Sequence, residues 1–169
     1  MSGVRATRDT AGMAVDGDRP AAAHSKLTDL VIVSGMSGAG KSSAMNVFED
    51  AGYFCVDNLP AEMIRSLAEL FTHPGSKVER AAVVSDSRGG DYLAALAGVI
   101  DDLDASGLAH RVVFLQADEQ TLLNRYKETR RRHPLAPHGS VVDGIRAEQE
   151  LLAPVLDRSD LVIDTSSLN

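Results

Sequence analysis

The stretch VIVSGMSGAGKSSA, residues 31–44, joins a short apolar segment to a glycine-rich one. Its first three residues are β-branched, as in a buried strand. Gly35, Gly38 and Gly40 follow, and glycine allows backbone angles that other side chains forbid. A lysine and two serines come next, before an amphipathic stretch begins. This order predicts a strand, a tight loop and the start of a helix.

The loop satisfies the pattern G-x-x-x-x-G-K-[ST] without a mismatch, in the strand-to-helix context that the pattern requires. Its N–H groups can point at one phosphate, and the helix N-terminus adds about half an elementary positive charge. Lys41 is expected to reach the β- and γ-phosphates, and the Ser42 hydroxyl to ligate Mg²⁺. The alternative is a turn that serves packing alone. The predicted nucleotide-binding residues are Gly35, Met36, Ser37, Gly38, Ala39, Gly40, Lys41 and Ser42.

Composition limits the class of protein. A chain of 169 residues with 44% hydrophobic residues fits one compact domain with a core. The net charge of −7 argues against a protein that coats polyanions. Cys55 is the only cysteine, which fits a reducing cytoplasm. No apolar run approaches the roughly 20 residues of a membrane helix. We therefore expect a soluble, cytoplasmic protein with no membrane partner.

The chain divides into a tail and a folded body. Residues 1–27 lack periodicity and apolar surface, and we expect them to be disordered. In residues 28–169, short apolar runs alternate with longer amphipathic stretches, which is typical of a parallel α/β sheet. We expect strands at 30–34, 53–56, 81–85, 111–116 and 161–164, and helices at about 41–51, 61–71, 91–105, 119–132 and 142–158. Asp118 is expected to cap the fourth helix, and Pro154 to kink or break the fifth.

The loop and this alternation together predict a three-layer α/β P-loop NTPase fold. Its five-stranded parallel sheet should have the kinase-like strand order 2-3-1-4-5. The N-K-x-D motif that reads guanine is absent, which argues against a common regulatory GTPase. The signature of transport ATPases is absent as well, so the kinase-like branch remains.

A metal ion at such a loop needs a second carboxylate, and Asp86 and Asp57 compete for this role. We favour Asp86, because the third strand of kinase-like folds lies beside the loop strand. Its alternative is a helix cap or an ordinary loop carboxylate. The residues after it suit a loop that contacts nucleotide. The predicted contacts of this segment are Asp86, Ser87, Arg88 and Gly89, with Ser42 and Asp86 as metal ligands.

Asp57 then lies where small-molecule kinases of this class hold the phosphate acceptor, unless its neighbours only form a turn. Positive charge gathers in RYKETRRRHPL, residues 125–135. Within it, Arg130 and Arg131 are candidates to stabilise the transferred phosphate. The alternative is a solvated helix end, where cations are favourable in any case. The histidines show no metal-ligand spacing, and we assign none of them chemistry.

Several motifs together resemble the RapZ/YvcJ family of bacterial nucleotide-binding proteins. They are SGMSGAGKS, EDAGYFCVDNLP at 49–60, DSR at 86–88, TRRRHPL at 129–135 and LVIDTS at 161–166. The resemblance covers residues 30–168 and implies an N-terminal P-loop domain that binds ATP and GTP and hydrolyses them slowly. Family members usually read D-V-R where this chain has DSR, so we predict no preference between the two nucleotides.

The family also has a C-terminal domain, which in some members is associated with RNA or metabolite binding. This chain stops just after LVIDTSSLN, so we expect an isolated N-terminal domain. RNA or metabolite binding is expected only through the absent C-terminal domain. A protein partner and a homo-oligomer are both compatible with the sequence.

Two functions from different classes follow. In the first, the domain is a regulatory NTPase, a switch or RNase-adapter module that responds to nucleotide. In the second, it is a small-molecule kinase that transfers the γ-phosphate of ATP to an acceptor near Asp57. The expected catalytic residues are Lys41, Asp86, Arg130 and Arg131 in both cases. Binding without turnover is a third alternative, since no residue that would position water is evident.

Overall fold

The computed structural model describes residues 27–85 and 90–168, in which parallel strands form one sheet in the order β2-β3-β1-β4-β5. The strands are β1 (Asp29–Gly35), β2 (Phe54–Leu59), β3 (Arg80–Ser85), β4 (Arg111–Gln116) and β5 (Leu161–Asp164). The helices are α1 (Lys41–Asp50), α2 (Ala61–Thr72), α3 (Gly90–Ser106), α4 (Glu119–Thr129) and α5 (Val141–Asp157). The predicted fold and strand order are confirmed. The predicted tail, up to residue 26, and the segment Asp86–Gly89 lie outside the described residues.

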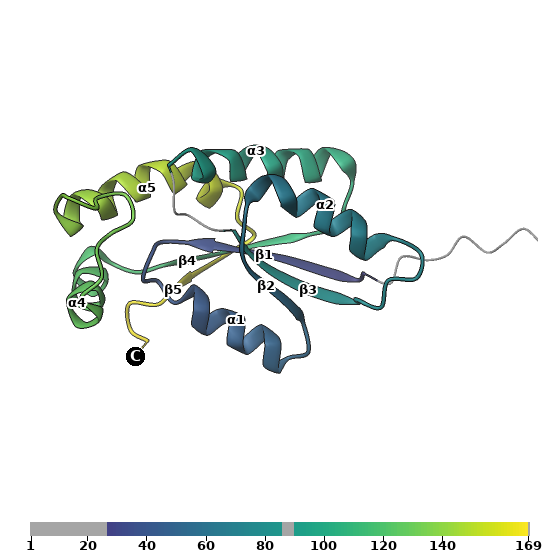
Figure 1. Cartoon of the computed structure of the whole chain (residues 1–169), viewed down its shortest axis with the longest axis horizontal. Coiled ribbons are helices and arrows are strands. Elements are labelled where there is room, and N and C mark those ends of the chain that lie inside the picture. Colours follow the sequence, from purple (N-terminus) through teal and green to yellow (C-terminus); the bar gives the residue numbers. More distant parts are fainter. Residues whose placement is uncertain (1–26, 86–89, 169) are drawn as a thin grey trace, which may run out of the picture.

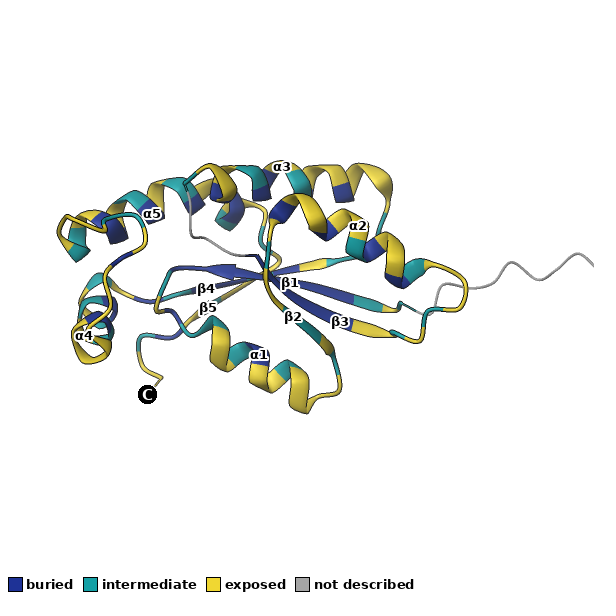
Figure 2. Ribbon diagram, viewed as in Figure 1, coloured by how far each residue is buried: buried dark blue, intermediate teal, exposed yellow. Residues whose placement is uncertain are grey.

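The sheet separates two layers of helices. Helices α2, α3 and α5 lie over one face, and α1 lies under the other (Figure 1). The central strands β1 and β3 are buried almost throughout, whereas the edge strands β2 and β5 expose side chains such as Phe54 and Leu161 (Figure 2). This is why the inner strands read as continuous apolar runs. The centre of the sheet is therefore rigid, and β1 carries the glycine-rich loop at its carboxyl end.

Three predictions about helices can be compared with the structure: the cap and the end of α4, and the effect of Pro154 on α5. Asp118 caps α4 as predicted, accepting a hydrogen bond from the Thr121 N–H at 2.7 Å. The helix ends at Thr129 and not at residue 132, because Arg130 takes a left-handed conformation with φ 51°. Helix α5 continues across Pro154 to Asp157, so the predicted break does not occur. Within the described ranges, no helix has the length and apolar content needed to cross a membrane.

Gly35 has a packing role that is independent of any ligand. It ends β1 with φ 137°, beside Leu115 of the neighbouring strand β4. A Cβ atom at this position would collide with the backbone carbonyl of Leu115. The Met36 N–H then donates to the Leu115 carbonyl at 3.0 Å, where the chain leaves the sheet. Glycine is thus required here for two strands to approach closely.

We expect Gly35→Ala to lower the free energy of unfolding by about 1–3 kcal/mol, because the two strands must move apart to admit the methyl group. Urea denaturation measures this loss. Gly98→Ala is the matched control, since it adds the same methyl group inside α3, where no atom lies within 4 Å. The control should gain about 0.5–1 kcal/mol from helix propensity. Equal stability of Gly35→Ala and the original chain would contradict the packing argument.

Candidate functional site

The glycine-rich loop, residues 35–42, connects the carboxyl end of β1 to the first turn of α1. We call it the phosphate loop. Gly38 and Gly40 have φ values of 84° and 99°, a region that other residues rarely adopt. Gly40 is the N-cap of α1 and supplies no side-chain cap, so the first N–H groups of the helix are not covered by a capping side chain. This is the backbone arrangement that receives a phosphate.

Lys41 is half-buried and lies against its own loop. Its Nζ donates to the carbonyl of Gly35 at 2.7 Å and to that of Met36 at 3.0 Å. These bonds hold the ammonium group at the mouth of β1. Ser42 follows on the exposed side of the first turn of α1. The two side chains predicted to meet phosphate and metal are therefore at the same end of the helix.

A buried carboxylate that the sequence analysis missed holds the loop from the other side. Glu148, on α5, is 0% exposed. Its Oε2 accepts the Ser37 backbone N–H at 2.9 Å, and its Oε1 accepts the Ser37 hydroxyl at 2.6 Å. Burial by itself raises the pKa of Glu148, but hydrogen bonds from His133 and Ser37 and the charge of Lys41 outweigh it, and the pKa is lowered.

His133 supports this carboxylate, a contact that the sequence analysis did not predict. Its Nε2 lies 3.2 Å from Glu148 Oε2, and its ring is 1% exposed. The Leu135 N–H donates to Nδ1 at 3.2 Å, so Nδ1 is an acceptor and the ring proton is on Nε2. Gly144 makes room for the ring, because a Cβ there would come within 2.5 Å of it. His133 thus donates to Glu148 in a sterically defined position.

A signal for Glu148 exists in the sequence. Ile145, Glu148, Leu152 and Val155 recur at helical spacing and are all buried on one face of α5. A carboxylate within such an apolar face needs buried partners. Periodicity alone does not say which partners these are, since Ser37 is 111 residues away in the chain.

Arg125 joins the phosphate loop to the segment after β5. Its guanidinium donates to the Gly38 carbonyl at 3.0 Å and to the carbonyls of Thr165 and Leu168 at 2.7 and 2.8 Å. The Thr165 hydroxyl in turn donates to the Ala39 carbonyl at 2.8 Å. The sequence analysis placed Arg125 only in a basic cluster. In the structure it fixes the outer side of the loop.

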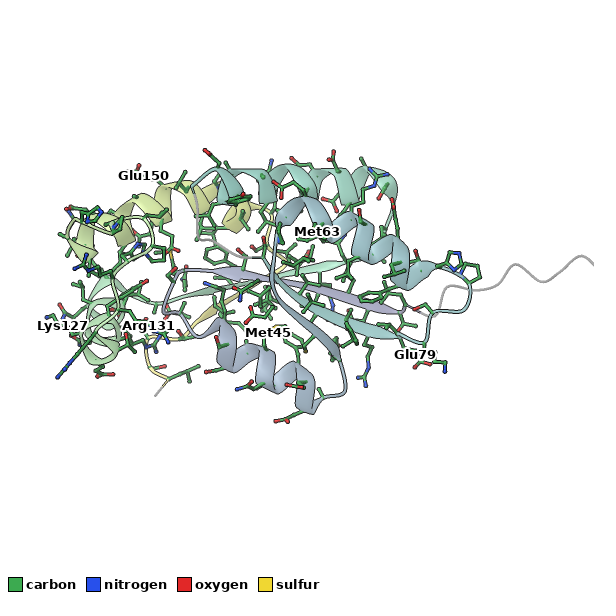
Figure 3. All side chains as sticks on the ribbon, viewed as in Figure 1. Met45, Met63, Glu79, Lys127, Arg131 and Glu150 are labelled. Atoms are coloured by element: carbon green, nitrogen blue, oxygen red, sulfur yellow. The ribbon has the colours of Figure 1, made fainter. Side chains whose placement is uncertain are left out.

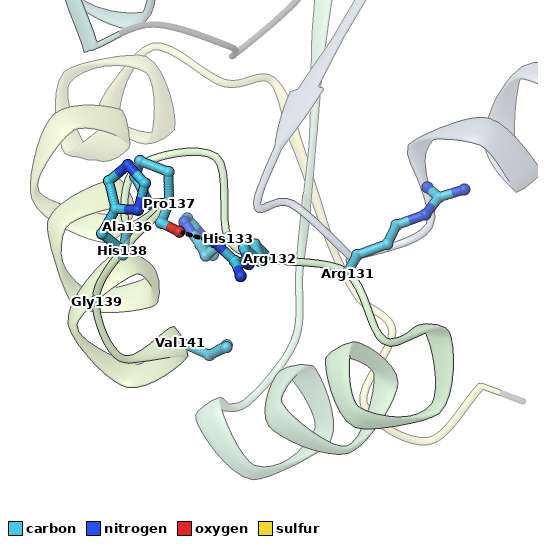
Figure 4. Close-up of a pocket in the computed structure, with 8 residues that line it drawn as sticks. All are labelled: Arg131, Arg132, His133, Ala136, Pro137, His138, Gly139 and Val141. Atoms are coloured by element: carbon cyan, nitrogen blue, oxygen red, sulfur yellow. Dashed lines mark hydrogen bonds between the residues drawn. The ribbon is translucent and has the colours of Figure 1, made fainter.

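We call residues 130–140 the basic segment. A cavity of about 360 Å³ lies against it, and Arg132 donates across the segment to the Pro137 carbonyl at 3.0 Å. Arg131 extends away from the other residues that line this cavity (Figure 4). In Figure 3, Arg131 and Lys127 are both labelled at the end of the molecule where α4 lies. Arg130 is exposed at the end of α4, so the two predicted arginines occupy the start of this segment.

Asp57 lies near the carboxyl end of β2, at an irregularity in the strand. The register with β3 shifts between Val56 and Leu59, and Asn58 has φ 55°. The Asn58 N–H donates to Asp57 Oδ1 at 2.8 Å, and both residues are exposed. Because the strands are parallel, their carboxyl ends meet at the same edge of the sheet. The second predicted segment, Asp86–Gly89, follows β3 at this edge in sequence but is outside the described residues.

The residues at the loop suit a metal ion that arrives with phosphates. In residues 27–85 and 90–168, no group of three or more His, Cys, Asp or Glu side chains is placed to hold a metal ion. Mg²⁺ is commonly bound by one or two protein oxygens together with phosphate oxygens. The Ser42 hydroxyl, exposed on the first turn of α1, is the oxygen that the sequence predicts for this role.

Comparison with known proteins agrees with this arrangement. Residues 28–169 match the family model described as the RapZ-like N-terminal domain. A nucleotide-binding protein of Desulfitobacterium hafniense is 45% identical over 145 residues, covering 86% of this chain and 49% of its own length. One from Listeria welshimeri is 48% identical over 145 residues, covering 85% of this chain and 50% of its own. The chain therefore spans about half the length of the curated relatives it matches.

Two solved structures are similar in fold. The shikimate kinase of Bacteroides thetaiotaomicron has a TM-score of 0.53 at 16% identity, over 80% of this chain and 85% of its own. The shikimate kinase of Acinetobacter baumannii, solved with shikimate, has a TM-score of 0.53 at 19% identity, over 84% and 86%. At these identities the likeness shows the fold, which is that of the P-loop kinases.

The lowered pKa of Glu148 predicts how stability depends on pH. The folded carboxyl group has a pKa below its ordinary value of 4.5, so it binds fewer protons than in the unfolded chain near that pH. Its contribution is present above pH 4.5 and is lost as the pH falls through the lower, folded-state pKa. We expect Glu148→Gln to lower the free energy of unfolding at about pH 7 by about 1–3 kcal/mol.

Below about pH 4.5, the free energy of unfolding should change less with pH in Glu148→Gln than in the original chain. Urea denaturation at about pH 7 and about pH 3.5 measures both effects. Glu150→Gln is the control, because it removes an exposed carboxylate from the outer side of the same helix (Figure 3). An unchanged acid dependence in Glu148→Gln would contradict the assignment.

Proposed function

Because the chain belongs to the RapZ-like N-terminal domain family, we propose that it binds ATP or GTP with Mg²⁺ at the phosphate loop and hydrolyses it slowly as a regulatory switch. Nucleotide binding itself is supported by the family, by relatives named nucleotide-binding proteins and by the P-loop kinase fold. The observation that carries the proposal is the backbone loop between β1 and α1, with the Lys41 ammonium group held over it.

The chemistry at this site is mainly positioning and charge stabilisation. Backbone N–H groups around Gly40 bind phosphate oxygens, and Lys41 moves its hydrogen bonds from loop carbonyls to the β- and γ-phosphates. Ser42 and Asp86 would hold Mg²⁺, which neutralises charge on the phosphates when bound. Asp86 follows directly after β3 in the sequence, and β3 is a neighbour of β1 in the sheet. Ser87, Arg88 and Gly89 are proposed to contact the nucleotide from the same segment.

A slow switch fits the protein better than rapid turnover. Glu148, the carboxylate that the structure places against the loop, is buried and already bonded to Ser37 and His133, which does not suit a residue that activates water. The output of such a switch, or RNase-adapter module, would pass to a protein partner or to a further domain. RNA or metabolite binding would then belong to the part of the relatives that this chain does not span.

Phosphate transfer to a small acceptor is the second candidate. The observation that favours it is the irregular end of β2, where Asp57 is exposed at the edge of the sheet that carries the phosphate loop. Bulges of this kind often re-aim a side chain next to an active site. In this reading Asp57 binds the acceptor hydroxyl, and Arg130 and Arg131 stabilise the transferred phosphoryl group.

Lys41→Ala should weaken binding of both ATP and GTP. The lost contact is a hydrogen bond between charged groups, worth about 1.5–3 kcal/mol, so we expect a loss of affinity of about 10- to 100-fold. Titration calorimetry with Mg²⁺ and each nucleotide measures it. Lys77→Ala is the control, since Lys77 is exposed between α2 and β3, before the amino end of the sheet. Undiminished affinity in Lys41→Ala would exclude the phosphate loop as the binding site.

The fate of the γ-phosphate separates the two candidate functions. We expect the purified chain, given γ-labelled ATP and a metabolite extract, to release the label as free phosphate. Replacing Arg130 and Arg131 together by Ala should slow this release more than it weakens binding, because the arginines stabilise charge in the transition state. Label on a new compound, lost in Asp57→Asn, would instead establish the kinase. If the double substitution changes neither rate nor affinity, the arginines are only a solvated helix end.

A further inference from the structure

The buried Glu148 connects two parts of the molecule that are distant in sequence. From α5 it reaches the phosphate loop through Ser37 and the basic segment through His133. Taking a carboxylate out of water is costly, and well-packed apolar residues in place of buried ionic groups are often neutral or stabilising. A carboxylate kept fully buried here therefore calls for a functional reason.

The Ser37 contact fixes the phosphate loop. The carboxylate accepts from both the backbone N–H and the hydroxyl of Ser37, so the peptide that joins Met36 to Ser37 is held in one orientation. The Tyr126 ring packs against the His133 ring, with centroids 5.2 Å apart and planes inclined at 42°. The position of the Ser37 peptide thus depends on the position of Glu148.

The His133 contact fixes the basic segment in the same way. The ring accepts from the Leu135 N–H and donates to Glu148, so a shift of the segment displaces the carboxylate. On the α5 side, the His133 ring lies so close to Gly144 that a Cβ atom there would come within 2.5 Å of it. The segment begins at the left-handed Arg130 and ends at Ser140, which caps α5 by accepting from the Asp143 N–H at 3.3 Å.

A bound triphosphate would act on this network through charge. Lys41 bonds to the Gly35 and Met36 carbonyls, and its charge favours the ionised form of Glu148. Phosphates that take up the Lys41 charge would weaken this attraction and place new negative charge near the carboxylate. The Glu148 carboxylate would then shift, and Ser37 and His133, which are bonded to it, would shift with it.

We propose that Glu148 and His133 are positioning residues that couple the basic segment to the phosphate loop, so that each responds to the state of the other. The inference rests on the proposed nucleotide site and adds a regulatory connection to it. Coupling between two sites is reciprocal, so it can be measured from either end. A substitution in the basic segment should alter the phosphate loop even when no nucleotide is added. Nucleotide bound at the phosphate loop should, in turn, alter the basic segment.

The first experiment needs no nucleotide. His133→Gln keeps an N–H donor for Glu148 and loses the ring, whereas His133→Phe keeps a ring and loses the donor. Amide hydrogen exchange over residues 35–42 is measured in both variants of the whole chain. We expect exchange close to the original in His133→Gln and about tenfold faster in His133→Phe, as loss of a hydrogen bond to a charged group implies. A purely packing role predicts the opposite order and would overturn the inference.

The second experiment uses Mg²⁺ and a non-hydrolysable ATP analogue. Trypsin cleavage after Arg130, Arg131 and Arg132, all exposed, reports on the basic segment. We expect the analogue to slow cleavage in the original chain and in His133→Gln, and to have no effect on it in His133→Phe at saturating analogue. Equal protection in His133→Phe would overturn the coupling. If the original chain binds no analogue, the proposed function fails, while the exchange experiment still decides the mechanical link.

Discussion

The contact between the Glu148 carboxylate and the Ser37 peptide is the constraint on which the candidate site depends. A phosphate loop is built from glycines that gain freedom in the unfolded chain, so something must hold its backbone in one conformation. Here a buried anion from the last helix holds the inner side of the loop, and Arg125 with Thr165 holds the outer side. The backbone N–H groups at the start of α1 are thereby presented in a fixed arrangement before any ligand arrives.

The residues that hold the phosphate loop all come from the second half of the chain. Arg125 lies on α4, Glu148 on α5, and Thr165 directly after β5. The ligand-facing part of the molecule is contributed by the first half, in β1 and α1. The site is thus formed by one end of the chain and stabilised by the other, which makes its geometry sensitive to how α4, α5 and β5 pack on the sheet.

The net charge of −7 does not show that positive side chains gather in one part of the molecule. Lys41 and the arginines of the basic segment gather at the end of the molecule that carries the phosphate loop, and the buried Glu148 lies among them. An anionic ligand in an overall acidic protein requires such a local concentration.

The glycine pattern at residues 35–42 identified the phosphate loop, because the spacing of glycine, lysine and serine is itself the chemical requirement. The alternation of apolar runs and amphipathic stretches likewise determined the class of fold and, with the loop, the strand order. The sequence could not place the end of α4, since nothing in the run of basic residues indicates that Arg130 takes a left-handed conformation. The helix predicted at 142–158 included Pro154, but the sequence did not show whether the helix would continue across this residue, as it does in the structure.

What only the tertiary structure decided is which polar groups meet. Ser37 and Glu148 are 111 residues apart, and Gly38 and Arg125 are 87 apart. Local patterns report on neighbours within a helix or a strand, whereas these pairs exist only once the sheet has brought its first and last elements together. The sequence identified the loop at which we propose that phosphate binds. The fold determined what holds that loop in position, because burial forces each buried charge to find its partner across the core.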